Sequence, residues 1–442
     1  MSKRKSGLFT LLLVLLSLSL ALTGCDSGLL ATLVPAPAAT STPAPGTALV
    51  PSPSASPATP TATRPAVEQL TLWMPVQFDP NSGTVAGNLL RARLDEFTRQ
   101  NPDLSVEVRI KASTGEGNLM ESLAAASAAA PDALPSVVIL SRSELENAAL
   151  KQLILPLDAY TDSLSDADWY PYAQQLATVQ ESTFGIPLAG DALLLIYRPV
   201  RYGSTPDGWE PILGHGQPLL FPAADPQSLL TLGLYLSAGG EVEDSQHRPV
   251  LQAGVLSKVL HLYADGASQG VFPSWLAQIN TDNQAWQSYL DQRGNLLVTW
   301  SSRYLTELPV DSSATTFPAL STGAPVLASG WLAAVSEPQT ERAEAAVRLA
   351  EFLTQAEFLS QWTPEVGYLP VRPSSLEDWP NQSLQELITQ LVNSAQVVPS
   401  NTILSSLAPA MQEASLNVIK NQSDPDQAAK DAAARLSGTT TP

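Results

Sequence analysis

Strand and helix patterns alternate along most of the chain, and this alternation constrains the fold more than any other feature. Residues 70–74 alternate apolar with other side chains as in a strand, and 90–97 then place apolar side chains at helical spacing until Asn101-Pro102 ends the helix. A second alternating strand follows at 104–110, and an Ala-rich helical stretch leads to the wholly apolar run 137–140. Strand, helix, strand, helix, strand predicts an α/β fold.

The rest of the chain continues this pattern and then becomes mostly helical. Two further apolar runs, 193–197 and 296–300, predict additional strands of the sheets. Apolar stripes at helical spacing predict helices over 346–353 and 404–418. Asp424-Pro425 has the form of an N-cap followed by proline at the first helical position, which predicts a last helix ending at Leu436.

The amino terminus has the features of an export signal. Three basic residues at 3–5 precede the uncharged, Leu-rich run 8–22, which is shorter than the ~20 residues of a membrane-spanning helix. The run ends in Leu22-Thr23-Gly24-Cys25, which resembles the lipobox of bacterial lipoproteins, whose cysteine is lipidated before cleavage. We therefore predict a lipoprotein signal peptide at 1–25 with Cys25 as the lipidated residue. The alternative is an ordinary signal peptide with an incidental cysteine.

A linker is predicted between this signal and the folded part. Residues 26–66 are rich in Pro, Ala, Ser and Thr, and Asp26 and Arg64 are their only charges. The prolines oppose helix and sheet pairing, and a segment without aromatic side chains cannot bury enough surface to order itself. We expect a disordered stalk that reaches on the order of 100 Å at ~3.1 Å per residue. The short tail 437–442 is expected to be disordered as well.

Composition excludes several classes of function. The formal net charge is −19, with 23 Lys and Arg against 42 Asp and Glu, so the chain lacks the basic surplus of a nucleic-acid-binding protein. A single cysteine rules out an intramolecular disulfide and a Cys-rich zinc site, and three histidines leave little for a histidine cage. The sequence therefore predicts no metal and no cofactor.

Eight short motifs occur in an order that resembles one family. They are Leu70-Thr71-Leu72-Trp73; Leu94 to Phe97 with Asn101-Pro102; Leu134 to Leu140; Leu153 to Tyr160; Gly185 to Leu188 with Leu193 to Tyr197; Gly294 to Trp300; Ser329 to Ala333; and Phe352 to Thr354 with Gly367 to Arg372. Together, over most of 67–436, they resemble the extracellular solute-binding proteins of ATP-driven (ABC) importers, in particular the sugar-type group related to maltose-binding protein.

This resemblance implies a two-lobe periplasmic-binding-protein fold of type II, with a mostly parallel sheet in each lobe and hinge strands between them. It places 67–187 and 296–334 in lobe 1, and 188–295 and 335–436 in lobe 2. It implies a monomer that captures a small solute, such as a sugar or oligosaccharide, and delivers it to the permease subunits. With the lipid anchor, the expected location is the outer face of the cell membrane.

Candidate ligand-binding residues follow the predicted strands. In open α/β sheets ligands bind beyond the carboxyl ends of the strands, and indole faces pack well against sugar rings. The residues at or near such positions are Trp73, Ser141, Arg142, Asp191, Trp300, Ser302, Arg303, Trp331 and Tyr368. Core packing remains the alternative for the three tryptophans, and a surface role for the two arginines. Trp169, Trp275, Trp286, Trp362 and Trp379 are predicted to lie in the core.

The sequence departs from the family at two places. Arg198-Pro199-Val200 stands where the family has Asn-Lys-Asp, and the segment around Gly214-His215-Gly216 is shortened before Phe221. The shortening removes part of the expected cleft wall in lobe 2.

An enzymatic reading has one motif in its favour. Gly266-Ala267-Ser268-Gln269-Gly270 fits the nucleophile-elbow pattern, but helical spacing precedes it where a strand is required, and all three histidines come before Ser268. A glycosidase needs only two opposed carboxylates, so the sequence leaves this class of enzyme as an open alternative. We expect a binding protein and no enzyme. The alternative is a surface sensor or adhesion lipoprotein that kept the fold without transport.

Overall fold

The computed structural model describes residues 68–321, 326–337 and 339–438, which all belong to one compact unit. The predicted signal peptide, the linker and residues 439–442 of the predicted tail lie outside the described residues. Within them, the last helix ends at Leu436 as the sequence predicted, and it begins at Pro425 after an Asp424 side chain that accepts from two backbone amides.

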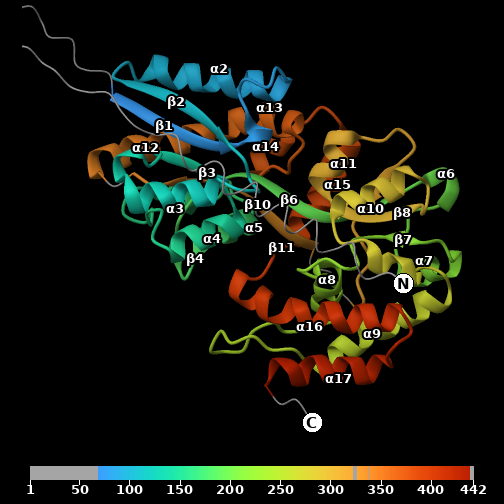
Figure 1. Ribbon diagram of the computed structural model, residues 1–442. Coiled ribbons are helices and arrows are strands. Elements are labelled where there is room, and N and C mark those ends of the chain that lie inside the picture. The colour runs from blue at the N-terminus through green and yellow to red at the C-terminus, as the bar shows by residue number, and fades with distance from the viewer. Residues whose placement is uncertain (1–67, 322–325, 338, 439–442) are drawn as a thin grey trace, which may run out of the picture. The chain divides into compact units, whose positions relative to one another are not determined.

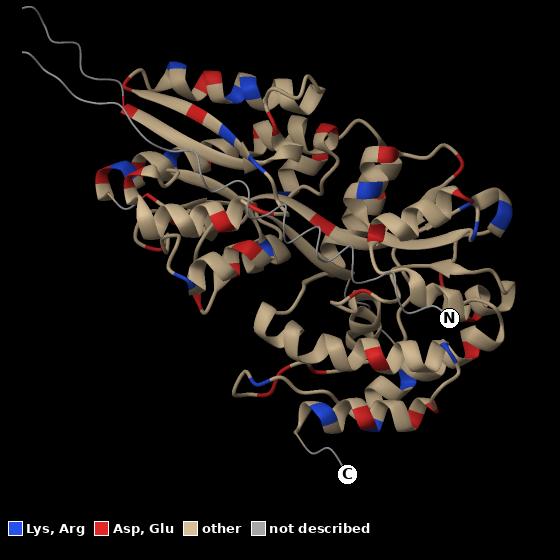
Figure 2. Ribbon diagram, in the orientation of Figure 1, with Lys and Arg blue, Asp and Glu red and all other residues tan. Residues whose placement is uncertain are grey.

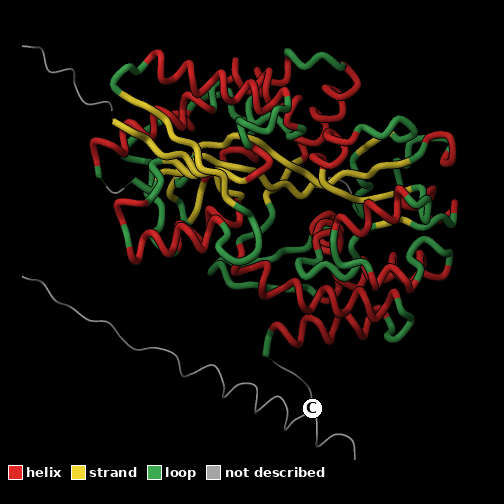
Figure 3. Tube along the Cα trace, turned by 45° about the horizontal axis from the view of Figure 1, so that its top comes forward, coloured by secondary structure: helices red, strands yellow, loops and turns green. Residues whose placement is uncertain are grey.

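A sheet of nine strands runs through this unit. In sequence order the strands are β1 (Glu68–Pro75), β2 (Leu104–Lys111), β3 (Val137–Ser141), β6 (Ile186–Tyr197), β7 (Leu219–Leu220), β8 (Leu296–Trp300), β9 (Ser313–Thr315), β10 (Val326–Val335) and β11 (Ala395–Val397). Their order in space is β2-β1-β3-β10-β6-β8-β7, with β11 on β10 and β9 on β6. A separate hairpin joins β4 (Thr178–Val179) to β5 (Ser182–Thr183). The strands form a continuous band with helices on both sides (Figure 3).

The helices account for most of the remaining described residues. They are α2 (Val85–Gln100), α3 (Leu119–Ala129), α4 (Arg142–Leu150), α5 (Pro171–Ala177), α6 (Pro199–Tyr202), α7 (Trp209–His215), α8 (Leu229–Ser237), α9 (Ala253–Ser268), α10 (Asp282–Leu290), α11 (Ser301–Glu307), α12 (Thr340–Leu353), α13 (Ala356–Val366), α14 (Pro373–Glu377), α15 (Gln382–Ser394), α16 (Asn401–Ile419) and α17 (Pro425–Leu436). Short 3₁₀ turns are η1 (Val76–Phe78), η2 (Pro131–Ala133), η3 (Ser163–Ser165) and η4 (Ser274–Gln278).

Two long strands explain why the sheet is mixed. β1 pairs in parallel with β2 and β3, and β7 pairs in parallel with β8. Within the nine-stranded sheet, every antiparallel pairing involves β6 or β10. These two strands cross from one part of the sheet to the other, so we call them the crossing strands. The predicted α/β fold is thus confirmed, with parallel strands in both parts.

Helices gather around each part of the sheet, which we call lobe 1 and lobe 2 (Figure 1). Lobe 1 contains β1–β3 with α2–α5 and α12–α14, and lobe 2 contains β7–β9 with α6–α11, α16 and α17. The expected division differs in two segments. β8, α11 and β9 (296–315) were expected in lobe 1, but β8 pairs with β6 and β7, and β9 pairs with the lobe 2 end of β6. α12–α14 were expected in lobe 2, but they pack on α2 and the sheet of lobe 1.

Local signals determine where helices begin and end, as α2 illustrates. The Thr84 side chain accepts from the Gly87 amide at its start, and the Asn101 side chain donates to the Phe97 carbonyl at its end. Leu90, Leu94 and Phe97 form the buried stripe between these caps. This is the stripe that the sequence predicted.

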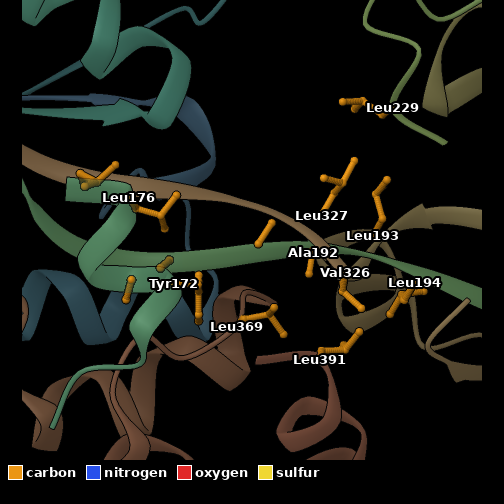
Figure 4. Packing of buried hydrophobic residues seen from close by; sticks show 14 of the residues in the cluster. Tyr172, Leu176, Ala192, Leu193, Leu194, Leu229, Val326, Leu327, Leu369 and Leu391 are labelled. Atoms are coloured by element: carbon orange, nitrogen blue, oxygen red, sulfur yellow. The ribbon is translucent and has the colours of Figure 1, made fainter. Parts of the chain in front are cut away.

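The middle of the crossing strands is covered closely by α5. Gly190 of β6 lies opposite Gly330 of β10, and a Cβ on Gly190 would collide with the Tyr172 ring. Figure 4 shows Tyr172 and Leu176 of α5 beside these strands, together with Leu369. The absence of side chains at the two glycines therefore allows a helix to pack directly on the crossing.

Candidate functional site

The carboxylate of Asp191 connects the crossing strand β6 to the start of α11 in lobe 2. It accepts hydrogen bonds from the Ser301 hydroxyl (2.7 Å), the Ser302 hydroxyl (2.6 Å) and the Ser302 amide (2.9 Å). The Ala192 amide is a fourth donor at 3.0 Å. Asp191 thus holds the first turn of α11, directly after Trp300. It acts on the predicted site by positioning this turn.

Burial raises the pKa of Asp191 to about 6, although the four donors favour the charged form. Because the native carboxyl then binds its proton more tightly than the unfolded one, its contribution to stability is full below pH ~4 and is lost as pH rises to about 6. We expect the unfolding free energy of the wild type to fall by about 3 kcal/mol relative to Asp191→Asn between pH 4 and pH 7. Urea unfolding followed by tryptophan fluorescence at several pH values measures this difference. Parallel curves for the two proteins would contradict it.

A cavity of about 450 Å³, which we call the interlobe cleft, lies between the lobes. Its volume falls in the roughly 300–1,000 Å³ range of small-molecule sites. Lobe 1 contributes Gln77, Thr84, Ala86, Glu365, Val366 and Tyr368, and lobe 2 contributes Asp282, Trp300, Ser302, Arg303, Thr306 and Glu307. Four of the predicted residues, namely Trp300, Ser302, Arg303 and Tyr368, are thus brought together here.

Trp300 borders both this cleft and a second, smaller cavity. The smaller cavity has a volume of about 120 Å³, and Trp300 and Asp282 line both spaces. The other residues around it belong to lobe 2 or to the lobe 2 half of β6: Leu193, Phe221, Pro222, Asp225, Gln227, Leu229, Leu230, Asn280, Thr281 and Val298. Trp300 is partly exposed because it follows the last buried residues of β8. Its indole is therefore accessible to a ligand in either space.

Trp331 and Tyr368 form an aromatic group beside the cleft. The ring of Phe78 lies edge-on to Trp331 at 5.3 Å and 5.6 Å from Tyr368. Burial raises the pKa of Tyr368, while hydrogen bonds with Trp331 and Gln77 act in the opposite direction. Tyr368 lines the cleft, whereas Trp331 supports it from the crossing strand β10.

Arg303 is held by two acidic neighbours. Its guanidinium lies 3.6 Å from Asp282 and 3.9 Å from Glu307. The Asp282 carboxylate also accepts from the Thr299 hydroxyl at 2.5 Å, and burial raises its pKa. The cleft therefore presents hydrogen-bonding groups of both kinds next to an aromatic face, an arrangement that suits a ligand with hydroxyl groups.

Three predicted residues lie elsewhere. Trp73 is only 4% exposed, with Lys111 above its ring at 4.2 Å, so core packing is the interpretation that fits. Ser141 caps α4 in a capping box with Glu144. Arg142 donates to the Thr178 carbonyl and lines a separate cavity between α4, the β4–β5 turn and the start of α16. Trp73 stays out of the cleft because it is buried in β1, and Ser141 and Arg142 stay out because the chain continues directly from β3 into α4.

The other tryptophans mostly behave as predicted. Trp169, Trp286, Trp362 and Trp379 are buried, whereas Trp275 is only partly buried against the core. Gln77, Asp282, Glu307 and Glu365 were missed as cleft residues. Gln77 follows the end of β1 and could have been found by the same rule as Trp300, whereas the others lie on helices whose approach no local pattern reveals.

Other kinds of site find no support in the part of the chain that the structure describes. No group of three or more His, Cys, Asp or Glu side chains there is arranged to hold a metal ion. Ser268 is the last residue of α9 and donates to the Asp265 carbonyl, so Gly266–Gly270 is no strand-to-helix elbow. None of the described helices has the length and apolar character of a bilayer span. Lys and Arg are spread over many elements (Figure 2).

Comparisons with known proteins agree with this geometry. The family described as bacterial extracellular solute-binding protein matches residues 92–387. A maltose-binding protein MalE of Listeria monocytogenes in complex with maltose is similar at a TM-score of 0.69 and 13% identity, over 85% of this chain and 100% of that one. The sugar-binding protein MalE of Xanthomonas citri is similar at a TM-score of 0.68 and 18% identity, over 84% and 97%.

A third solved structure, the maltose-bound MalE3 of T. maritima, is similar at a TM-score of 0.64 and 17% identity, over 84% of this chain and 100% of that one. A comparison with curated protein sequences found no significant match. At these identities the structures establish the fold, and the match over residues 92–387 establishes the family. This chain belongs to the bacterial extracellular solute-binding proteins, a family of binding proteins and not of enzymes.

Proposed function

We propose that this chain captures an oligosaccharide in the interlobe cleft and delivers it to the permease of an ABC transporter. The observation that carries the proposal is the cleft itself, which takes six side chains from each lobe around the partly exposed Trp300. Solved structures of the same fold are described in complex with maltose and with cycloalternan, which supports a carbohydrate ligand. Trp300 would stack on a sugar ring, while Gln77 and Ser302 would bond its hydroxyl groups.

Ligand binding should change the solution form of the protein. A ligand that contacts both lobes favours the state in which they are closest, so we expect the radius of gyration to decrease on binding. Isothermal titration against a panel of neutral oligosaccharides identifies a ligand, and small-angle X-ray scattering with and without it measures the change. Unchanged scattering at saturation would count against a closing cleft.

Membrane attachment is a further part of the proposal. Cys25 is the only cysteine of the chain and follows Leu22-Thr23-Gly24, so Cys25→Ser leaves no thiol for lipidation. We expect this variant to remain unprocessed or to be released, and to incorporate no labelled fatty acid. Metabolic labelling with palmitate and detergent partitioning test this, with Ser27→Ala as a neighbouring control. Acylation of the Cys25→Ser protein would overturn the anchor.

A further inference from the structure

The interlobe cleft and the smaller cavity beside it are lined by more acidic than basic side chains. Asp282, Glu307 and Glu365 line the interlobe cleft, and Asp225 lines the smaller cavity. Arg303 is the one basic residue among the lining residues of both spaces. It already lies within 4 Å of Asp282 and Glu307, so its charge is shared between two carboxylates. A surplus of negative charge therefore remains at the site.

The acidic side chains that line the cleft come from both lobes. Glu365 belongs to α13 of lobe 1, is exposed, and forms no ion pair or hydrogen bond within the described residues. Asp282 and Glu307 belong to lobe 2, whose α11 contacts α13 (Figure 1). A Cβ on Gly367 would meet the Thr306 hydroxyl at 2.5 Å, so the lobes approach closely beside these acids. Carboxylates that line the same cavity repel each other, and a cation bound among them reduces that repulsion.

We infer that the bound solute carries positive charge and is an oligosaccharide with protonated amino groups. An ammonium group between Glu365 and the Asp282–Glu307 side would donate up to three hydrogen bonds and offset the repulsion between the lobes. The ring that bears it would lie against Trp300, which also attracts cations over its face. Burial raises the pKa of Asp282, and a nearby cation would oppose that shift. This inference rests on the proposed function and names its ligand class.

The test compares two ligands that differ only in the group at C2 of each ring. A β-1,4-linked glucosamine trimer and cellotriose differ at C2, where one has an ammonium group and the other a hydroxyl group. We expect the glucosamine trimer to bind the full-length protein at least ten times more tightly in 50 mM salt at pH 6. The ratio should decrease toward one in 500 mM salt, because screening weakens the interaction of the charges. Isothermal titration measures both affinities.

Two variants that each remove one negative charge distinguish an effect of the cleft acids from an effect of the protein's overall negative charge. Glu365→Gln should reduce the preference for the glucosamine trimer about three- to tenfold. Glu344→Gln, an exposed acid on α12 outside the cleft lining, should leave the preference unchanged. Equal effects of the two variants, or tighter binding of cellotriose, would overturn the inference.

The outcomes also distinguish the inference from the proposed function. Binding of a neutral oligosaccharide from the panel without any preference for the amino sugar leaves the proposed function standing and overturns the inference. Failure of every neutral and cationic saccharide to bind the folded protein overturns both.

Discussion

Replacing Arg198 by alanine should destabilise lobe 2 by about 2–5 kcal/mol, because its guanidinium satisfies several groups that are buried beneath it. Arg198 is 7% exposed and donates to the Tyr289 carbonyl (2.9 Å), the Gly294 carbonyl (3.1 Å) and the Asp311 carboxylate (2.7 Å). The guanidinium also lies 3.9 Å from the centre of the Tyr289 ring. Its removal leaves two backbone acceptors without their partner, which is costly in a buried site.

Urea unfolding at pH 7 measures this loss, and Arg201→Ala is the matched control. Arg201 lies on the short helix α6, which Arg198 precedes as its N-cap, but Arg201 is exposed, so its removal should change the unfolding free energy by less than about 0.5 kcal/mol. Equal losses in the two variants would contradict a structural role for Arg198. Arg198 is the first residue of Arg198-Pro199-Val200, the segment that differs from the family pattern. The difference therefore places a buried arginine at the end of β6, where it bonds to α10 and to the loop at Asp311.

Replacing Trp300 by alanine should weaken ligand binding by about 1–3 kcal/mol, or roughly 5- to 150-fold. The reason is that its indole lines both cavities, directly before the start of α11. Its stability loss should be smaller than that of Trp73→Ala, since Trp300 is partly exposed and Trp73 is buried. For Trp73→Ala we expect about 3–5 kcal/mol of lost stability and an unchanged affinity of the folded protein.

Unfolding free energy and affinity measured on the same two variants separate the cleft residue from the core residue. The ligand is the tightest binder of the oligosaccharide panel. If Trp300→Ala loses as much stability as Trp73→Ala and keeps its affinity, Trp300 is a core residue and the aromatic face of the cleft has no role in binding.

Much of the fold could be predicted because each strand and helix has its own local signal. The run 296–300 was predicted as a strand and is β8, and Asp424-Pro425 was predicted to open the helix that is α17. β6 is longer than its apolar run because Ile186, Pro187 and the residues that follow them also pair with β10. Such elements are recognised from spacing, caps and apolar runs, which depend on neighbours in sequence.

The candidate site was predicted in part, and the difference between two strand ends shows why. Side chains that follow β8 line the cleft, because the carboxyl end of β8 points at the gap between the lobes. Ser141 and Arg142 follow β3 in the same way, but the chain turns directly into α4, where Ser141 becomes a cap and Arg142 lies against the β4–β5 hairpin. The direction of that turn depends on what α4 packs against.

By itself, the sequence determined the α/β class, most strands and helices, and the residues that follow β8. Only the tertiary structure decided that β8 joins lobe 2, that α12–α14 join lobe 1, and that Glu365 lines the same cavity as Asp282 and Glu307. The reason is that a strand or helix is specified by contacts a few residues away. Its lobe is selected by pairing and packing with segments far along the chain, and the spacing of residues within an element carries no record of those partners.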